Sequence, residues 1–342
     1  MTALRDASAA TLLLLAAIWA GSGGFAHLDA ALLGYLGATI VAVFGTAWRI
    51  STAWRRPAAA FYVRALWRAC RDPRALRRTL AAAGRDVAAQ RFIARRSRMR
   101  WVAHMLLSLG TLASFAITLP LVFGWMRFAA DGQTAYRVLV VSLPMGRFVL
   151  DGAVAWLVFH GLVLAAVAVV VGALYFLVLR WRARRLPGMA SAFHTGPLLL
   201  LLSVAVTGLA LPATRGHPDV FPVVAVLHEL TVVVLLVAMP FSKLGHLLIR
   251  PLQLGAQLVR ATGEPSAACA GCGAAFAPSA QLASVEALLR ARGLAFDAHQ
   301  RHCPDCRRRR LAATQAGLMG AHFQPPLSGV FPRPIVKTER AA

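Results

Sequence analysis

The chain has 342 residues, of which 58% are hydrophobic and 15% are charged, and its mean hydropathy is +0.62. These values exclude an ordinary soluble domain, because several apolar runs exceed the roughly 20 residues that cross a bilayer. The formal net charge of +24 would suggest a nucleic-acid partner on a soluble protein. Here the charge lies between the apolar runs, so we expect an all-α membrane protein with no nucleic-acid partner.

The first apolar stretch, Ala9–Ala26, has two interpretations. It is short, Arg5 precedes it, and four small residues, Gly21–Gly24, follow its leucine run. Residues 1–27 are therefore either a signal peptide or an extra membrane helix that forms the first arm of a hairpin. The retained Met1 slightly favours the hairpin.

Five further apolar stretches predict membrane spans, so the sequence favours a five- or six-helix transmembrane bundle over residues 28–255. These spans lie near Leu28–Trp48, Trp101–Trp125, Gly152–Leu179, Ser191–Leu211 and Val223–His246.

Arginine is concentrated in particular connections. The insertion 49–100 contains fifteen arginines against Asp72 and Asp86, and a second basic loop follows at Arg180–Arg185. The positive-inside rule places these segments and the C-terminus in the cytoplasm, in a bacterial-type inner membrane. The insertion mixes arginine with aromatic residues at helical spacing, which predicts amphipathic helices against anionic lipid on the inner face.

Histidines inside membrane spans are functional candidates, because an ionisable side chain is costly there and imidazole is a common axial ligand of haem iron. His228 and His246 are 18 residues apart. On one continuous helix they would share a face and lie about 27 Å apart along the axis, which suits two b haems, one per leaflet. The alternative is that both are merely hydrated.

Two further histidines have matching depths. His104 opens the second predicted span on the inner side and can pair with His246. His160 lies in the outer part of the third span and can pair with His228. The remaining candidates, His27, His194 and His217, are expected at helix ends or in solvent.

Two segments of the fifth span carry a resemblance to a known family. His228–Leu230 reads HEL and Met239–His246 reads MPFSKLGH. They resemble the last helix of the gamma, or cytochrome b, subunit of respiratory nitrate reductase. The wider family includes the heterodisulfide-reductase-like membrane cytochromes b, to which the long basic insertion is more similar. Thr207–Leu209 in the fourth span also resembles the family. The resemblance as a whole covers roughly residues 28–255.

The resemblance implies two b haems, a quinol site near the outer haem and electron delivery to a cytoplasmic iron–sulfur partner. It matches His104 and His246 to the inner haem and His228 to the outer one. The expected partner of His228 falls on Ser114, which departs from the pattern. Either His160 replaces this ligand or one haem is bound. The chain has no ferredoxin-type cysteine run, so the iron–sulfur partner would be a separate protein.

Residues 256–320 contain two C-x2-C pairs, Cys269 with Cys272 and Cys303 with Cys306, separated by thirty residues. Two such pairs supply four thiolates for zinc or a single iron. We expect a zinc-ribbon-like or rubredoxin-like module and favour structural zinc, because the intervening sequence predicts a helix at Ala280–Arg292. The tail 321–342 is Pro-rich and is expected to be irregular.

The sequence thus predicts a haem b subunit of a respiratory complex. It would transfer electrons between the quinone pool and a cytoplasmic iron–sulfur or redox subunit, as part of a quinol-linked oxidoreductase. The alternative is a non-haem transporter or a membrane scaffold that carries a zinc-ribbon tail.

Overall fold

The structure is a computed structural model that describes residues 2–28, 32–183, 192–245, 251–261 and 265–320. The chain divides into two compact units, Met1–Leu258 and Val259–Ala342. The division falls inside helix α11 (Pro251–Ala261).

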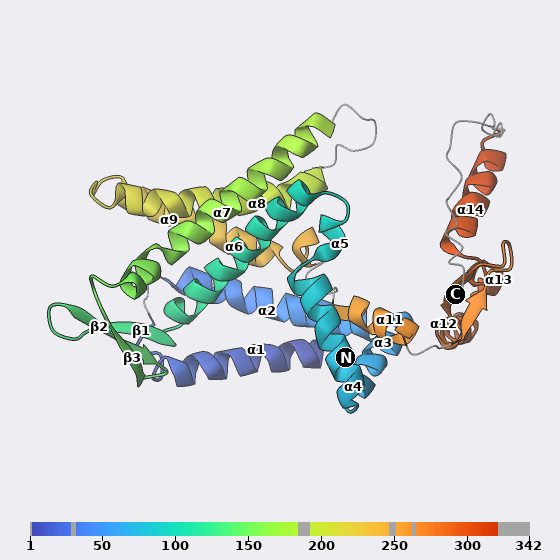
Figure 1. The fold of residues 1–342 in the computed structure, drawn as a ribbon, viewed down its shortest axis with the longest axis horizontal. Coiled ribbons are helices and arrows are strands. Elements are labelled where there is room, and N and C mark those ends of the chain that lie inside the picture. Colours follow the sequence, from blue (N-terminus) through green and yellow to red (C-terminus); the bar gives the residue numbers. More distant parts are fainter. Residues whose placement is uncertain (1, 29–31, 184–191, 246–250, 262–264, 321–342) are drawn as a thin grey trace, which may run out of the picture. The chain divides into compact units, whose positions relative to one another are not determined.

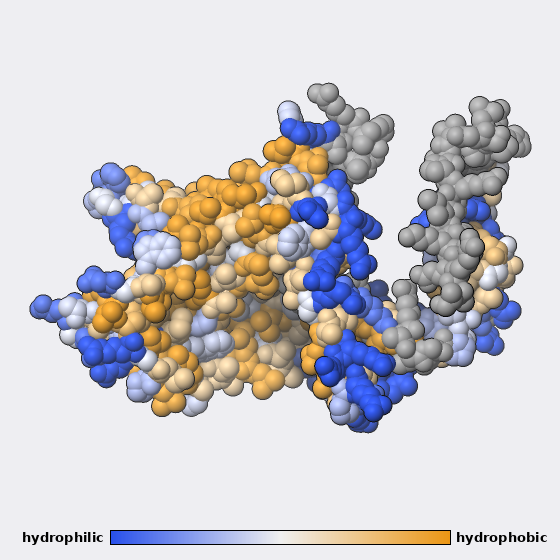
Figure 2. Space-filling view, viewed as in Figure 1, coloured by the Kyte–Doolittle hydropathy of each residue, from blue (hydrophilic) through white to orange (hydrophobic). Residues whose placement is uncertain are grey.

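Six helices of the first unit are long and apolar enough to cross a membrane, which confirms the predicted polytopic fold. Figure 2 shows a largely apolar band on this unit between two hydrophilic ends. The six helices are α1 (Thr2–Gly21), α2 (Leu33–Trp54), α6 (Arg98–Val122), α7 (Ala153–Ala183), α8 (Ala192–Thr214) and α9 (Phe221–Ala238).

Helices α1 and α2 pack against each other as an antiparallel hairpin (Figure 1). Gly23 and Gly24 have φ of +66° and +69°, a left-handed conformation that glycine adopts without steric cost. At the other end of the hairpin, the Asp6 carboxylate accepts hydrogen bonds from Ser51 at 2.6 Å and Arg55 at 2.5 Å. The start of α1 is thereby tied to the end of α2.

The basic insertion is helical, as predicted. It contains α3 (Pro57–Ala69), α4 (Pro73–Ala82), the π-helix η2 (Ala83–Ala88) and α5 (Arg91–Ala94). Phe61, Ala65 and Ala69 of α3 are buried at a spacing of four residues, so one face of this helix packs inward. Figure 2 shows this end of the first unit as strongly hydrophilic, and its exposed arginines make it basic.

The centre of the bundle is a small-residue core. Ala166, Val169, Leu201, Ala205 and Leu235 form one cluster over α7, α8 and α9, and Ala38, Ala42 and Leu236 form a second over α2 and α9. Glycine allows α6 and α7 to approach closely. A Cβ on Gly110 would lie 2.7 Å from the Ala165 carbonyl oxygen, and one on Gly172 would lie 2.6 Å from that of Ala103. Small residues are used in this way where membrane helices cross.

The prediction of one continuous helix from Val223 to His246 is wrong. Helix α9 ends at Ala238, and a turn leads into a short 3-10 helix, η3 (Lys243–Gly245). Pro240 follows this end. Because proline has no backbone N–H, it cannot donate the hydrogen bond that a longer α9 would need at this position. The calculated separation of His228 and His246 along one axis therefore does not apply, and His246 itself lies outside the described residues.

A three-stranded antiparallel sheet between α6 and α7 was not predicted. It consists of β1 (Met126–Ala130), β2 (Ala135–Val140) and β3 (Leu143–Val149), in the order β1-β2-β3. Phe148 of β3 is buried and its ring lies 6.4 Å from that of Phe159 on α7. The sheet therefore packs on the first turns of α7, at the opposite end of α6 from the basic insertion.

The second unit holds the cysteine module. Its elements are β4 (Ser266–Ala268), β5 (Ala275–Pro278), α12 (Ser279–Ala291), α13 (Asp297–Gln300) and α14 (Pro304–Leu318). Strands β4 and β5 pair antiparallel, and the helix predicted between the two cysteine pairs corresponds to α12. The Pro-rich tail 321–342 lies outside the described residues.

Candidate metal centre and membrane histidines

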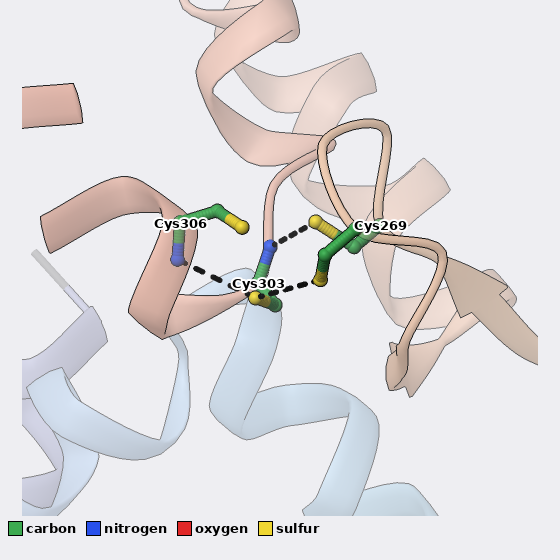
Figure 3. A group of neighbouring side chains, drawn as sticks. Cys269, Cys303 and Cys306 are labelled. Atoms are coloured by element: carbon green, nitrogen blue, oxygen red, sulfur yellow. Dashed lines mark hydrogen bonds between the residues drawn. The ribbon is translucent and has the colours of Figure 1, made fainter. Parts of the chain in front are cut away.

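The four cysteines come from two short turns. Cys269 and Cys272 lie in the connection between β4 and β5, where Gly273 has a φ of +72° and closes the turn. Its N–H donates to the Cys269 carbonyl at 2.9 Å. Cys303 precedes α14 and accepts a hydrogen bond from the Cys306 N–H in the first turn of that helix. Figure 3 shows how the turn and the helix start bring these side chains together.

The sulfur atoms have the spacing of a tetrahedral site. All four lie within 4.8 Å of one another, and Cys272 Sγ lies 3.7 Å from Cys303 Sγ. A zinc ion with Zn–S bonds of about 2.3 Å separates its tetrahedral ligands by about 3.8 Å. The predicted four-cysteine cluster is therefore formed, with a donor set that suits zinc or iron.

Backbone donors prepare the cluster for negative charge. The Cys303 N–H lies 3.1 Å from Cys269 Sγ and the Gly271 N–H lies 3.4 Å from it. These bonds, that from Cys303 foremost, lower the pKa of the Cys269 thiol to about 6. Hydrogen bonds with Cys303 and Cys272 raise the pKa of the Cys306 thiol to about 12. Four thiolates so close together need a bound cation to balance their charge.

Arginines fix the loop beside the cluster. His302 is 8% exposed, and its Nδ1 donates to the Ala298 carbonyl at 2.8 Å. Its Nε2 then accepts a hydrogen bond from Arg310 at 2.7 Å, so both ring nitrogens are engaged and His302 is not a ligand. Arg307 donates to the carbonyls of Gln300 and His302, each at 2.7 Å. The two arginines thereby hold the segment Ala298–His302 that leads into Cys303.

Among the membrane histidines, His228 has the best-defined environment. It is half-buried on α9, and its Nδ1 lies 2.9 Å from Thr207 Oγ1 on α8. The Thr207 hydroxyl donates its own proton to the Ser203 carbonyl at 2.8 Å, so it accepts from His228 Nδ1–H. The lone pair of the imidazole is then on Nε2. Gly208 leaves room for the ring, since a Cβ there would lie 3.1 Å from His228 Cε1.

His160 and His104 lie in different surroundings. His160 is exposed on α7, donates from Nδ1 to the Trp156 carbonyl at 2.9 Å and stacks on the Trp156 ring. His104 is half-buried near the start of α6, edge-on to Phe176 of α7. The contacts of His160 are thus with its own helix, whereas those of His228 are with α8. The structure does not bring these two rings into contact. Ser114 donates to the Gly110 carbonyl at 2.9 Å on its own helix.

Two contacts were missed in the sequence. Arg49 of α2 donates to the carbonyl of Pro240 and, at 3.2 Å, to that of Ser242, and so caps the segment that follows α9. The Glu229 carboxylate lies against Gly34 of α2 in the bundle. The signal for Arg49 was its position at a span end, paired with a proline that frees carbonyl groups in another span. A carboxylate inside a span was itself the signal for Glu229.

Comparison of the chain with known protein families, with curated proteins and with solved structures finds no match. On its own features, the chain is a multi-pass membrane protein with a four-cysteine metal-binding site.

Proposed function

We propose that the protein is the membrane-embedded haem b subunit of a respiratory, quinol-linked oxidoreductase. It would carry electrons between membrane quinone and a separate cytoplasmic iron–sulfur or redox subunit. The proposal follows the resemblance to the nitrate reductase gamma subunit and the heterodisulfide-reductase-like cytochromes b. It is supported by histidines on the membrane helices, at depths where haem is held in that family.

The observation that carries the proposal is the state of His228. Haem iron binds a neutral imidazole through one nitrogen, while the other nitrogen donates to a second group that fixes the ring. Thr207 accepts from Nδ1–H, which leaves the lone pair of the His228 imidazole on Nε2. A half-buried imidazole in a membrane span, oriented in this way, fits haem ligation. The iron of a bound haem would accept and release single electrons.

The ligands divide into two candidate pairs. His104 and His246 are proposed for the inner haem, and Arg49 holds the chain at Pro240 and Ser242, shortly before His246. His228 is proposed for the outer haem, with His160 as its partner. The exposed position of His160 makes this second pair the weaker one, because its ring would have to leave Trp156 to reach His228.

For the cysteine module we propose structural zinc. The N–H donors around Cys269 stabilise thiolates for either metal. However, the second cysteine pair lies at the start of helix α14, and α12 lies in the chain between the two pairs, a layout that suits a zinc ribbon. We further propose that the basic end and the C-terminus are cytoplasmic, in a bacterial-type inner membrane. The arginines of α3–α5 would then face anionic lipid.

The test is the reduced-minus-oxidised visible spectrum of the purified full chain, combined with a haem count per chain. We expect the α-band of b haem. His104→Ala and His228→Ala should each lower the haem content, whereas His217→Ala, on the exposed turn after α8, should not. A wild-type preparation that retains its membrane fold and its cysteine-bound metal but shows no haem band would refute the proposal.

Glu229 favours a second candidate, a non-haem transporter or scaffold with a zinc-ribbon tail. Its carboxylate lies within α9 against Gly34 of α2, and intramembrane carboxylates are common on proton and ion pathways. Proton uptake by liposomes that contain the protein, abolished by Glu229→Gln, would favour this candidate if no haem is present.

A further inference from the structure

The sheet between α6 and α7 has one turn at the end of the membrane spans. Strand β1 begins soon after α6 and pairs with the end of β2, Met126 opposite Val140. The Val141 N–H, in the turn between β2 and β3, donates to the Trp125 carbonyl at 2.8 Å. Trp125 in turn donates from Nε1 to the Ala17 carbonyl near the end of α1, at 3.1 Å. The turn therefore lies where two spans end (Figure 1).

The two turns of this sheet have opposite chemistry. The turn between β1 and β2, residues 131–134, reads DGQT and is polar. The segment 138–146, which contains the turn between β2 and β3, reads VLVVSLPMG and has no charged residue. Its side chains at Val141, Leu143 and Met145 are 49%, 65% and 69% exposed. The polar turn is at the far end of the strands and the apolar turn is beside the spans.

The backbone of the apolar turn also departs from what water-exposed hairpins favour. Val141 and Ser142 have φ of +48° and +67°. Two-residue hairpins with this conformation prefer asparagine, aspartate or glycine, and a β-branched residue there is rare. A valine at this position combines a disfavoured conformation with an apolar side chain in the open, which solvent exposure alone does not explain.

We infer that the turn between β2 and β3 is inserted into the lipid interface at the non-basic end of the bundle. The turn is surrounded by the boundary between lipid headgroups and acyl chains. This region accepts exposed apolar side chains next to an aromatic residue at the end of a span. The turn lies beside the last residues of α1 and α6, and Arg127 of β1 donates to its Ser142 hydroxyl at 3.2 Å. This inference uses only the membrane-spanning architecture, so it is independent of the proposed haem.

The test places a fluorescent amino acid at Met145 by amber suppression, in the full chain reconstituted into phospholipid liposomes. A probe at Leu143 serves as a second position, and one at Gln133, exposed in the polar turn of the same sheet, serves as the matched control. Nitroxide-labelled lipid and aqueous iodide are used as quenchers. Neither measurement needs an added cysteine, so the metal cluster is left intact.

We expect lipid nitroxide to quench the probes at 145 and 143 severalfold more than the probe at 133, and iodide to show the reverse order. Equal iodide quenching at all three positions would overturn the inference, because the apolar turn would then be in water. Weak quenching by both reagents at 145 and 143 would also overturn it, because protein would then cover the turn.

Discussion

Replacing Thr207 with valine should disturb His228 without changing the shape of the α8 surface. Valine is close in volume to threonine but lacks the hydroxyl that accepts from His228 Nδ1–H at 2.9 Å. An unsatisfied donor in the bundle costs about 1–3 kcal/mol. Loss of a group that orients a metal-bound histidine lowers affinity by about 10–100-fold. We expect the Thr207→Val protein to lose haem more readily and to show a shifted haem midpoint potential.

The assay follows haem content and redox potential of detergent-solubilised protein during competition with apomyoglobin. Thr207→Ser is the matched control, because it keeps the hydroxyl and should restore both quantities. If Thr207→Val and Thr207→Ser retain haem equally and have the same potential as wild type, then the Thr207 hydroxyl does not orient His228 and our assignment of its tautomer is wrong.

The other predictions concern the metal site and the packing of the bundle. Cys306→Ser should reduce bound metal several-fold, measured by elemental analysis, with the separate Cys70→Ser as its control. In metal-free protein the Cys269 thiol has a pKa of about 6 against 9.0, so its ionisation stabilises the module increasingly from pH 6 towards pH 9, above which the raised pKa of the Cys306 thiol opposes it. That contribution should be lost as the pH falls through 6, read from pH-dependent unfolding of the module. Arg49→Met should destabilise the bundle by about 1.5–3 kcal/mol for each lost charged hydrogen bond. Arg49→Lys should recover part of this in detergent unfolding. Gly110→Leu should separate α6 from α7 and lower the yield of folded protein, whereas Gly37→Leu, which meets nothing within 4 Å, should not.

The spans and the cysteine cluster were predictable because their signals are local. A run of apolar residues long enough to cross the bilayer identifies a span without knowledge of its neighbours. Two C-x2-C pairs define four ligands whose geometry follows from short turns. The amphipathic helices of the basic insertion were likewise visible from the spacing of Phe61 and Trp67 on α3 and of Leu76 on α4.

The sheet and the end of α9 were not predicted from the sequence. In residues 126–149 arginines interrupt the alternation of strands, and the turn at Val141 and Ser142 has none of the usual hairpin residues. Pro240 was a signal that a helix would end, but the prediction of a span from Val223 to His246 did not use it. The acceptors of Arg49 lie 191 and 193 positions away in the sequence, and the Thr207–His228 contact depends on how the consecutive helices α8 and α9 face each other, so the sequence named neither partner.

The contact of Arg49 with the chain after α9 has a consequence for biogenesis. The guanidinium and the Pro240 carbonyl are separated by 191 positions in the chain. Arg49 is synthesised early, and its acceptors become available only after the last span has been synthesised and inserted. The contact between Arg49 and the segment after α9, at the basic end of the bundle, can therefore form only at the final step of insertion. A chain truncated before α9 lacks the acceptors of Arg49, so its guanidinium should stay without this contact.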